Sequence, residues 1–197
     1  MSAQDFLSNK LFQAVEIGEL SNLSKIISEN NIDVTQYFDT TLSSLLIKAI
    51  FVNQTEISLF LLDIAKNNIN NELFLTWIES KNESGFNALH YASFRGNIKI
   101  MKKLIELGSD INATNKNGLN IMHISAQGNQ ATSIAYIKEI LNIDVNSLDA
   151  VDSTPLHWAS YMDAEYAFNY LIYFGADINA KDIDGSTPLH LAVMNGI

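Results

Sequence analysis

The chain has 197 residues, of which 47% are hydrophobic and 17% charged, with a net charge of −10. This composition is typical of a folded globular protein and argues against a disordered chain. The acidic balance disfavours nucleic acid as a partner, because phosphate backbones attract basic surfaces. The absence of cysteine excludes disulfides and cysteine nucleophiles and fits a cytoplasmic location.

No secretory signal or membrane span is predicted. The N-terminal "MSAQDFLSNK" lacks a basic start followed by an apolar run. Even the most apolar stretches, such as residues 44–52, are far shorter than the ~20 residues that a membrane helix needs. We therefore expect no membrane insertion by this chain.

The first 82 residues are predicted to form two atypical helical units. The first runs from Met1 to about Ile32 and sets Ala14 and Gly18 four residues apart. The second covers about residues 31–81 and repeats that spacing in another sequence context. It also contains an apolar pattern over residues 69–80 that predicts an extra short helix.

From residue 83 onward the sequence repeats. Its only four histidines are spaced 33, 34 and 33 residues apart, and they lie within "GFNALHYASFRGN", "GLNIMHISAQGN", "DSTPLHWASYMD" and "GSTPLHLAVMNG". Three residues before the histidine, each segment has a residue suited to cap a helix start: Asn87, Asn120, Thr154 and Thr187. Proline follows both threonines, at the first helical position, where its missing N–H costs nothing.

A second amphipathic helix is predicted in each complete repeat, over residues 97–108, 132–142 and 165–175. These helices end at Gly108, Asn142 and Gly175, residue types that adopt the left-handed conformation of a helix end. Protruding turn-rich loops follow. Asp152 stands where the other repeats have glycine, and aspartate also tolerates a positive φ.

This 33-residue period with its Thr-Pro-Leu-His-x-Ala core resembles the ankyrin-repeat family. The resemblance implies an all-α solenoid of about six helix-turn-helix units, the first two irregular and the last incomplete. The chain is expected to be a single domain, with atypical capping repeats over residues 1–82 and regular repeats over 83–197. The last repeat stops after its first helix, so the sequence reads as part of something longer.

The recurring histidines invite a catalytic interpretation, which the repetition argues against. Catalysis needs one site where a base, an orienting group and a pocket converge. In the family that the chain resembles, this imidazole is hydrogen-bonded near the helix start. We therefore predict a structural role for all four, and no enzymatic activity in this chain: His90, His123, His157 and His190.

No metal or cofactor site is predicted. The loop carboxylates lack the alternating ligands and closing glutamate of a calcium loop. No glycine-rich phosphate loop or zinc-protease motif occurs. Trp158, which follows a repeat histidine, is expected to pack between repeats.

The resemblance implies a binding groove lined by the residues that follow the alanine pair of each first helix. Apolar side chains there suit peptide anchoring, although packing against neighbouring helices is the alternative. "HISAQGN" reads as one residue shorter than "HYASFRGN", so only Gln127 is assigned in that repeat. The groove positions are Glu16, Ile17, Phe51, Val52, Phe94, Arg95, Gln127, Tyr161, Met162, Met194 and Asn195. The loop tips form a second expected contact row: Lys116, Asn117, Asp149, Ala150, Asp182 and Ile183.

The expected function is to bind an extended segment of another protein. After Leu141 eight acidic residues accompany a single base, Lys181, which indicates either a basic partner segment or a merely solvated surface. An apolar segment is the other possibility.

The segment from Ser153 onward is also similar to the ankyrin part of Asp-His-His-Cys palmitoyltransferases. Its "PLHWA" and the "YLI" of the following helix carry this likeness. The likeness implies a substrate-recruiting domain at the cytosolic face of a membrane, with the catalytic part beyond residue 197. The two functional hypotheses stay open at this point.

Overall fold

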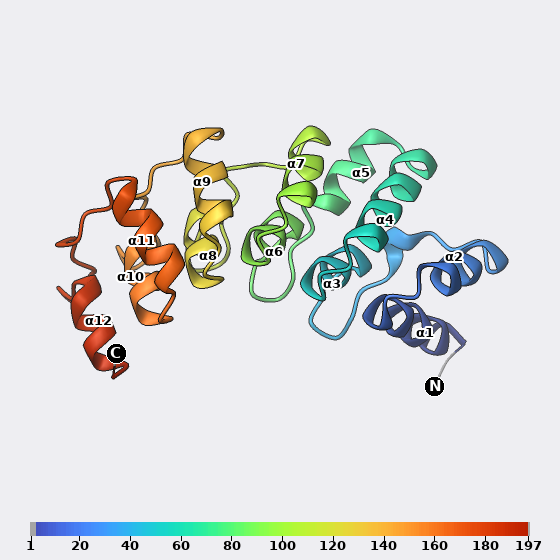
Figure 1. Ribbon diagram of the computed structural model, residues 1–197. Helices are drawn as coiled ribbons and strands as arrows, with labels where there is room; N and C mark the ends of the chain where they lie inside the picture. Colours follow the sequence, from blue (N-terminus) through green and yellow to red (C-terminus); the bar gives the residue numbers. More distant parts are fainter. Residues whose placement is uncertain (1–2, 197) are drawn as a thin grey trace.

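The structure is a computed structural model that describes residues 3–196, and its helices stack one after another in chain order (Figure 1). Within the described residues the only regular secondary structure is helical, apart from an isolated bridge between Phe38 and Ser44. The predicted all-α solenoid is confirmed.

The helices form two rows. Six of them contact one another in succession and lie along the concave side of the arc in Figure 1. These inner helices are α1 (Ala3–Ile17), α3 (Leu45–Phe51), α6 (Ala88–Phe94), α8 (Ile121–Gln127), α10 (Pro155–Tyr161) and α12 (Pro188–Met194). The outer row comprises α2 (Leu20–Glu29), α4 (Thr55–Asn68), α7 (Ile98–Glu106), α9 (Ala131–Glu139) and α11 (Glu165–Tyr173).

Two further elements belong to the irregular N-terminal half. A 3-10 turn at Val34–Gln36 contacts α4, and the predicted extra helix is α5 (Asn71–Ile78), which follows α4. Asn70 caps α5 by accepting a hydrogen bond from the backbone of Leu73 at 2.9 Å. This insertion accounts for the long step between the second and third inner helices.

Small residues let the inner helices approach closely. In the first five inner helices the alanine positions and their serine counterpart are at most 2% exposed: Ala14, Ala49, Ala92, Ser125 and Ala159. Four residues after each, the chain turns with a positive φ, at Gly18, Asn53, Gly96, Asn129 and Asp163. Asn142 and Asp152 also have positive φ, as the sequence predicted.

This register corrects the interpretation of "HISAQGN" as a shortened segment. Asn129 takes the place of Gly96, and Gly128 takes the place of Arg95, so no residue is missing. Gly128 has an ordinary negative φ, but a Cβ there would lie 2.3 Å from the carbonyl oxygen of Phe94. Glycine is required at position 128 because α8 packs directly against the end of α6.

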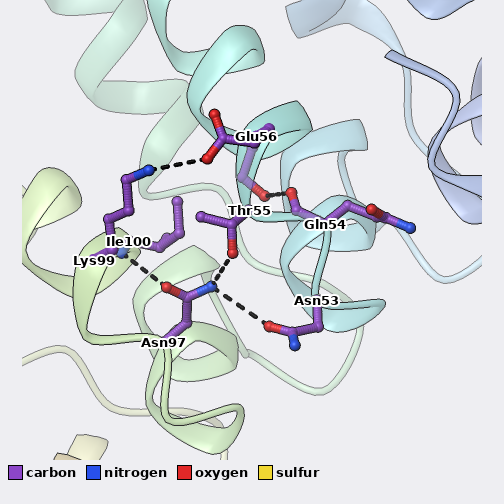
Figure 2. Close-up of polar contacts among 8 residues, drawn as sticks. Asn53, Gln54, Thr55, Glu56, Asn97, Lys99 and Ile100 are labelled. Carbon is purple, nitrogen blue, oxygen red and sulfur yellow. Dashed lines mark hydrogen bonds and ion pairs between the residues drawn. The ribbon is translucent and has the colours of Figure 1, made fainter.

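Polar side chains tie the irregular half to the regular repeats at the starts of α4 and α7. Figure 2 shows the amide of Asn97 between the two helices, with Nδ2 donating to the Thr55 hydroxyl at 2.7 Å and Oδ1 capping Ile100 at 3.1 Å. An ion pair joins Lys99 to Glu56 at 2.9 Å, and its exposure makes it a minor contribution. Asn97 thus aligns the two halves of the stack.

Candidate functional site

The predicted groove residues lie at the C-terminal ends of the inner helices, with unequal access to solvent. Phe51, Tyr161, Met162 and Met194 are 41%, 45%, 47% and 78% exposed, and Arg95 is also exposed. Phe94 and Gln127 are half-buried, and Val52 packs partly against the core. Ile17, at the end of α1, is 59% exposed. Exposed apolar side chains therefore recur along this edge of the stack.

An apolar cavity of about 190 Å³ opens at this edge, between α3, α6 and α8. Its lining residues are Phe51, Phe86, His90, Tyr91, Phe94, Ile124 and Gln127. The Tyr91 ring packs edge-on against Phe51, with centroids 5.6 Å apart, and at a tilted angle against Phe86, with centroids 5.8 Å apart. These mutual contacts hold the aromatic walls in place.

Arg95 lies at the rim of this cavity. Its guanidinium carbon is 4.8 Å from the centroid of the Phe51 ring and 5.7 Å from that of Phe94. Its Nε donates a hydrogen bond to the Phe51 carbonyl at 2.6 Å. Stacking and this hydrogen bond together fix the plane of the guanidinium.

A smaller hollow of about 150 Å³ shares Phe51 and Tyr91 with the cavity. Its lining includes Asp39 and Lys48. Lys48 is paired with Glu16 at 3.1 Å, so its charge is already compensated.

Three cavity residues escaped the sequence prediction: Phe86, Tyr91 and Ile124. Phe86 precedes the helix cap, where the last two repeats have Ser153 and Ser186, so an aromatic residue there is a usable signal. Tyr91 and Ile124 follow the repeat histidines. Only the structure shows that three repeats together enclose one cavity.

The loop tips need one correction. Lys116 and Asn117 are exposed as expected, and Asp182 is half-buried. Asp149 is buried, at 7% exposure, because its carboxylate accepts hydrogen bonds from within the chain. Its Oδ2 accepts from Trp158 Nε1 at 2.8 Å, and its Oδ1 accepts from the backbone of Ser153 at 2.9 Å. Asp149 is therefore unavailable to a partner, and Trp158 packs next to this loop.

The histidines occupy equivalent positions at the starts of four inner helices. In the third copy the backbone N–H of Thr154 donates to His157 Nδ1 at 3.1 Å. The proton is therefore on Nε2, which donates to the Ser186 carbonyl of the next repeat at 3.0 Å. His123 makes the same second bond to Ser153 at 3.1 Å.

Histidine burial also bears on ionisation. Burial lowers the pKa of His90 to about 4 and also lowers the pKa of His123. His90 Nε2 is buried without a hydrogen-bond partner; the nearby Leu119 carbonyl, which raises this pKa slightly, falls outside bonding geometry. Each of the four repeats contributes one histidine, and the four side chains do not converge on one site.

The comparison with protein families decides the classification. A family model of three ankyrin repeats matches residues 11–115 and 96–182. This chain belongs to the ankyrin-repeat family. The ankyrin match includes four of the six inner helices in full and the regular histidine repeats up to the loop after α11.

Similar curated proteins carry their ankyrin-like segment within much longer chains. Palmitoyltransferase AKR1 of Lachancea kluyveri is 29% identical over 182 residues, which is 89% of this chain and 23% of the relative. AKR1 of Eremothecium gossypii is 36% identical over 136 residues, covering 52% and 18%. The NAD-dependent deacetylase sir2B of Dictyostelium discoideum is 29% identical over 145 residues, covering 73% and 19%. The chain spans about a fifth of the length of these relatives.

Within residues 3–196 of this ankyrin chain, no group of three or more metal-ligating side chains comes together. No helix in that range is long and apolar enough to cross a bilayer.

Proposed function

We propose that this ankyrin chain binds an extended segment of a partner protein along the groove defined by the exposed ends of α1, α3, α6, α8, α10 and α12. Ankyrin repeats act as protein-interaction modules, and an aromatic-lined cavity in the groove supports the proposal. A bulky apolar side chain entering a cavity of about 190 Å³ removes apolar area from water on both partners.

Charge adds to this proposal at the C-terminal end. Beyond residue 141 the exposed acids include Asp152, Asp163, Glu165 and Asp184, against one base, Lys181. A segment that continues over these repeats gains from basic side chains. The partner segment we propose is thus apolar at the cavity and basic toward α12. The tips at Lys116, Asn117 and Asp182 form its outer contacts.

The double substitution Phe94→Ala with Tyr161→Ala tests the groove. The two residues lie two repeats apart, so only a segment that spans several repeats contacts both. Twelve-residue random peptides displayed on phage are selected against the chain, and the enriched peptides are titrated against both proteins. We expect the double variant to lose binding by about 100-fold or more, since two such anchors contribute of order 2 kcal/mol each.

Tyr166→Ala with Tyr173→Ala is the matched control, because these aromatics on α11 are 67% and 80% exposed and lie outside the groove. This control is expected to bind as wild type does. Both variants should keep the wild-type helical circular dichroism. Peptides that bind the groove variant as tightly as wild type would show that the groove assignment is wrong.

A second candidate function rests on the AKR1 relatives. We propose that the chain serves as the substrate-recruiting part of a membrane-bound protein S-palmitoyltransferase, at the cytosolic face of the membrane. The match over 89% of this chain supports this reading. The chain contains no cysteine, so the acyl-carrying residue belongs to another part of such an enzyme.

Reading the coding sequence on either side of this segment tests the second candidate. An Asp-His-His-Cys segment among apolar runs of ~20 residues is the expected result. A complete coding sequence without such runs would contradict this candidate and leave the groove proposal intact.

A further inference from the structure

Arg95 is the single arginine of the chain, among eleven lysines, and it lies in the proposed groove. Its guanidinium covers Phe51 and Phe94, two walls of the apolar cavity. The Nε hydrogen bond to Phe51 uses one of its five N–H donors. Within the described residues, no hydrogen bond or ion pair occupies the other four donors. They form a fixed fork at the mouth of the cavity.

The neighbouring cation, Lys48, differs from Arg95 because it has an ion-pair partner. Lys48 lies on the other side of Phe51 but is paired with Glu16 at 3.1 Å. Within the described residues the Arg95 guanidinium therefore has no ion-pair partner, in a protein whose net charge is −10. A carboxylate matches this fork in charge and in planar shape. A phosphate dianion would leave one charge uncompensated, so the observations favour the carboxylate.

We infer that the groove recognises a segment in which an apolar side chain fills the cavity and a carboxylate two residues away binds Arg95. This inference rests on the groove function proposed above. In an extended segment, residues i and i+2 point to the same side and lie about 6.6 Å apart. The guanidinium carbon lies 4.8 Å and 5.7 Å from the centroids of two rings that form cavity walls, so a side chain next to the cavity on the same side of the segment can reach it.

The carboxylate belongs to an aspartate or glutamate side chain within the segment. Exposed apolar residues continue the groove on both sides of the cavity, at Ile17 toward α1 and at Tyr161 and Met162 toward α12. A bound segment therefore runs past Arg95 in both directions. Repulsion from the distant acids of the chain is screened beyond about 8 Å at physiological salt.

The experiment starts from the peptides selected against the wild-type chain. We expect them to pair Leu, Ile, Met or Phe with Asp or Glu two positions away. Changing that acid to Gln in a synthetic peptide should weaken binding to wild type about tenfold, as expected for a lost charge-assisted hydrogen-bond pair. The same change should alter binding to Arg95→Gln less than about twofold, because the carboxylate has lost its partner there.

Two variants provide matched controls. Lys99→Gln removes a cation of α7, in the outer row of helices, that is paired with Glu56 at 2.9 Å, so the acidic peptide should bind it within about twofold of wild type. Arg95→Glu should reverse the preference, so that a peptide with Lys in place of its acid binds better than the acidic one. The second outcome cannot arise from misfolding, because the same variant gains affinity for one peptide.

Three results would overturn this inference. If the selected peptides show no preference for an acid and bind Arg95→Gln as tightly as wild type, Arg95 does not bind a carboxylate. The proposed groove function would be unaffected by that result. A phosphotyrosine or a free C-terminus that replaces the acid with at least tenfold tighter, Arg95-dependent binding would identify a different ligand. Peptides insensitive to the Phe94 and Tyr161 double substitution, or no binder below a Kd of about 1 mM, would overturn the groove function as well.

Discussion

Helices α10 and α12 start with the same four residues, Thr-Pro-Leu-His, and with the same local geometry. The backbone N–H of the threonine donates to the histidine Nδ1 at 3.1 Å in α10 and at 3.0 Å in α12. The leucines that precede these histidines differ completely: Leu156 is fully buried, whereas Leu189 is 71% exposed. One motif therefore occurs in two very different environments.

The difference separates what a repeat does alone from what its neighbour adds. The start of the helix is local, since the cap and the proline act within one turn. Burial comes from the next repeat: α10 packs between α8 and α12, whereas within the described residues α12 contacts only α10 strongly. The stabilising effect of the motif is thus mostly an interface effect, as expected for a solenoid.

The largest predicted contrast comes from the two leucines. Leu156→Ala leaves a cavity in the core between repeats, and we expect it to lower the free energy of unfolding by about 2–5 kcal/mol. Leu189→Ala should change it by less than about 0.5 kcal/mol, because the side chain is already in water. Urea denaturation of both variants measures the contrast. Equal losses would mean that the two helices share one environment in solution.

A second prediction concerns pH and the buried His90. Its pKa is about 4 when folded and about 6.5 when unfolded, so between these values the unfolded state binds more protons. Stability is therefore complete above pH 6.5 and falls as the pH decreases toward 4. For His90 alone, the loss amounts to about 2 kcal/mol at pH 5.

The measurement compares the pH dependence of unfolding for wild type and His90→Gln. The variant should lose less stability between pH 7.5 and pH 5, because it lacks one titrating group. A wild-type slope in His90→Gln would place the titration elsewhere.

The architecture could be predicted from the sequence because the features that define each repeat depend on interactions between residues close together in the chain. Capping residues, prolines and the alanine register each act within one turn, and each is visible in one sequence. The irregular helix α5 was also predicted from its apolar spacing. The segment "HISAQGN" reads as one residue shorter than "HYASFRGN" because both end in Gly-Asn, whereas in the structure Asn129 adopts the positive φ that Gly96 has in the other repeat.

The candidate site was less predictable because it depends on contacts between repeats. The exposed groove positions followed from the family register, whereas Phe86 and Tyr91 became part of the site only through packing across α3, α6 and α8. The prediction that Asp149 is an exposed loop-tip residue was wrong because it, too, depends on a contact that the repeat pattern does not show. Its carboxylate is used by Trp158, nine residues away, a pairing that no local pattern specifies.

The histidines of α10 and α12 differ in the same way as the leucines, in a single hydrogen bond to the next repeat. The His157 ring bonds to two residues: Nδ1 accepts from Thr154 within the same turn, and Nε2 donates to the Ser186 carbonyl of the next repeat. His190 is exposed and makes the local bond to Thr187. Because a buried hydrogen bond contributes roughly 1–3 kcal/mol when one partner is removed, His157→Ala should lower the free energy of unfolding by that amount. His190→Ala should lower it by less than about 1 kcal/mol.

The acceptor in the second bond is the backbone carbonyl of Ser186, which a side-chain substitution cannot remove. The effect of losing this bond can instead be followed by hydrogen exchange of the backbone amides in the neighbouring helices. In His157→Ala the amides of α12 should exchange faster, since the bond that ties the start of α12 to α10 is gone. In His190→Ala the amides of α10 should keep their wild-type protection. Faster amide exchange in α10 of His190→Ala would show that the cap bond between Thr187 and His190 also stabilises the neighbouring repeat. The cap bond could then no longer be treated as acting only within its own helix.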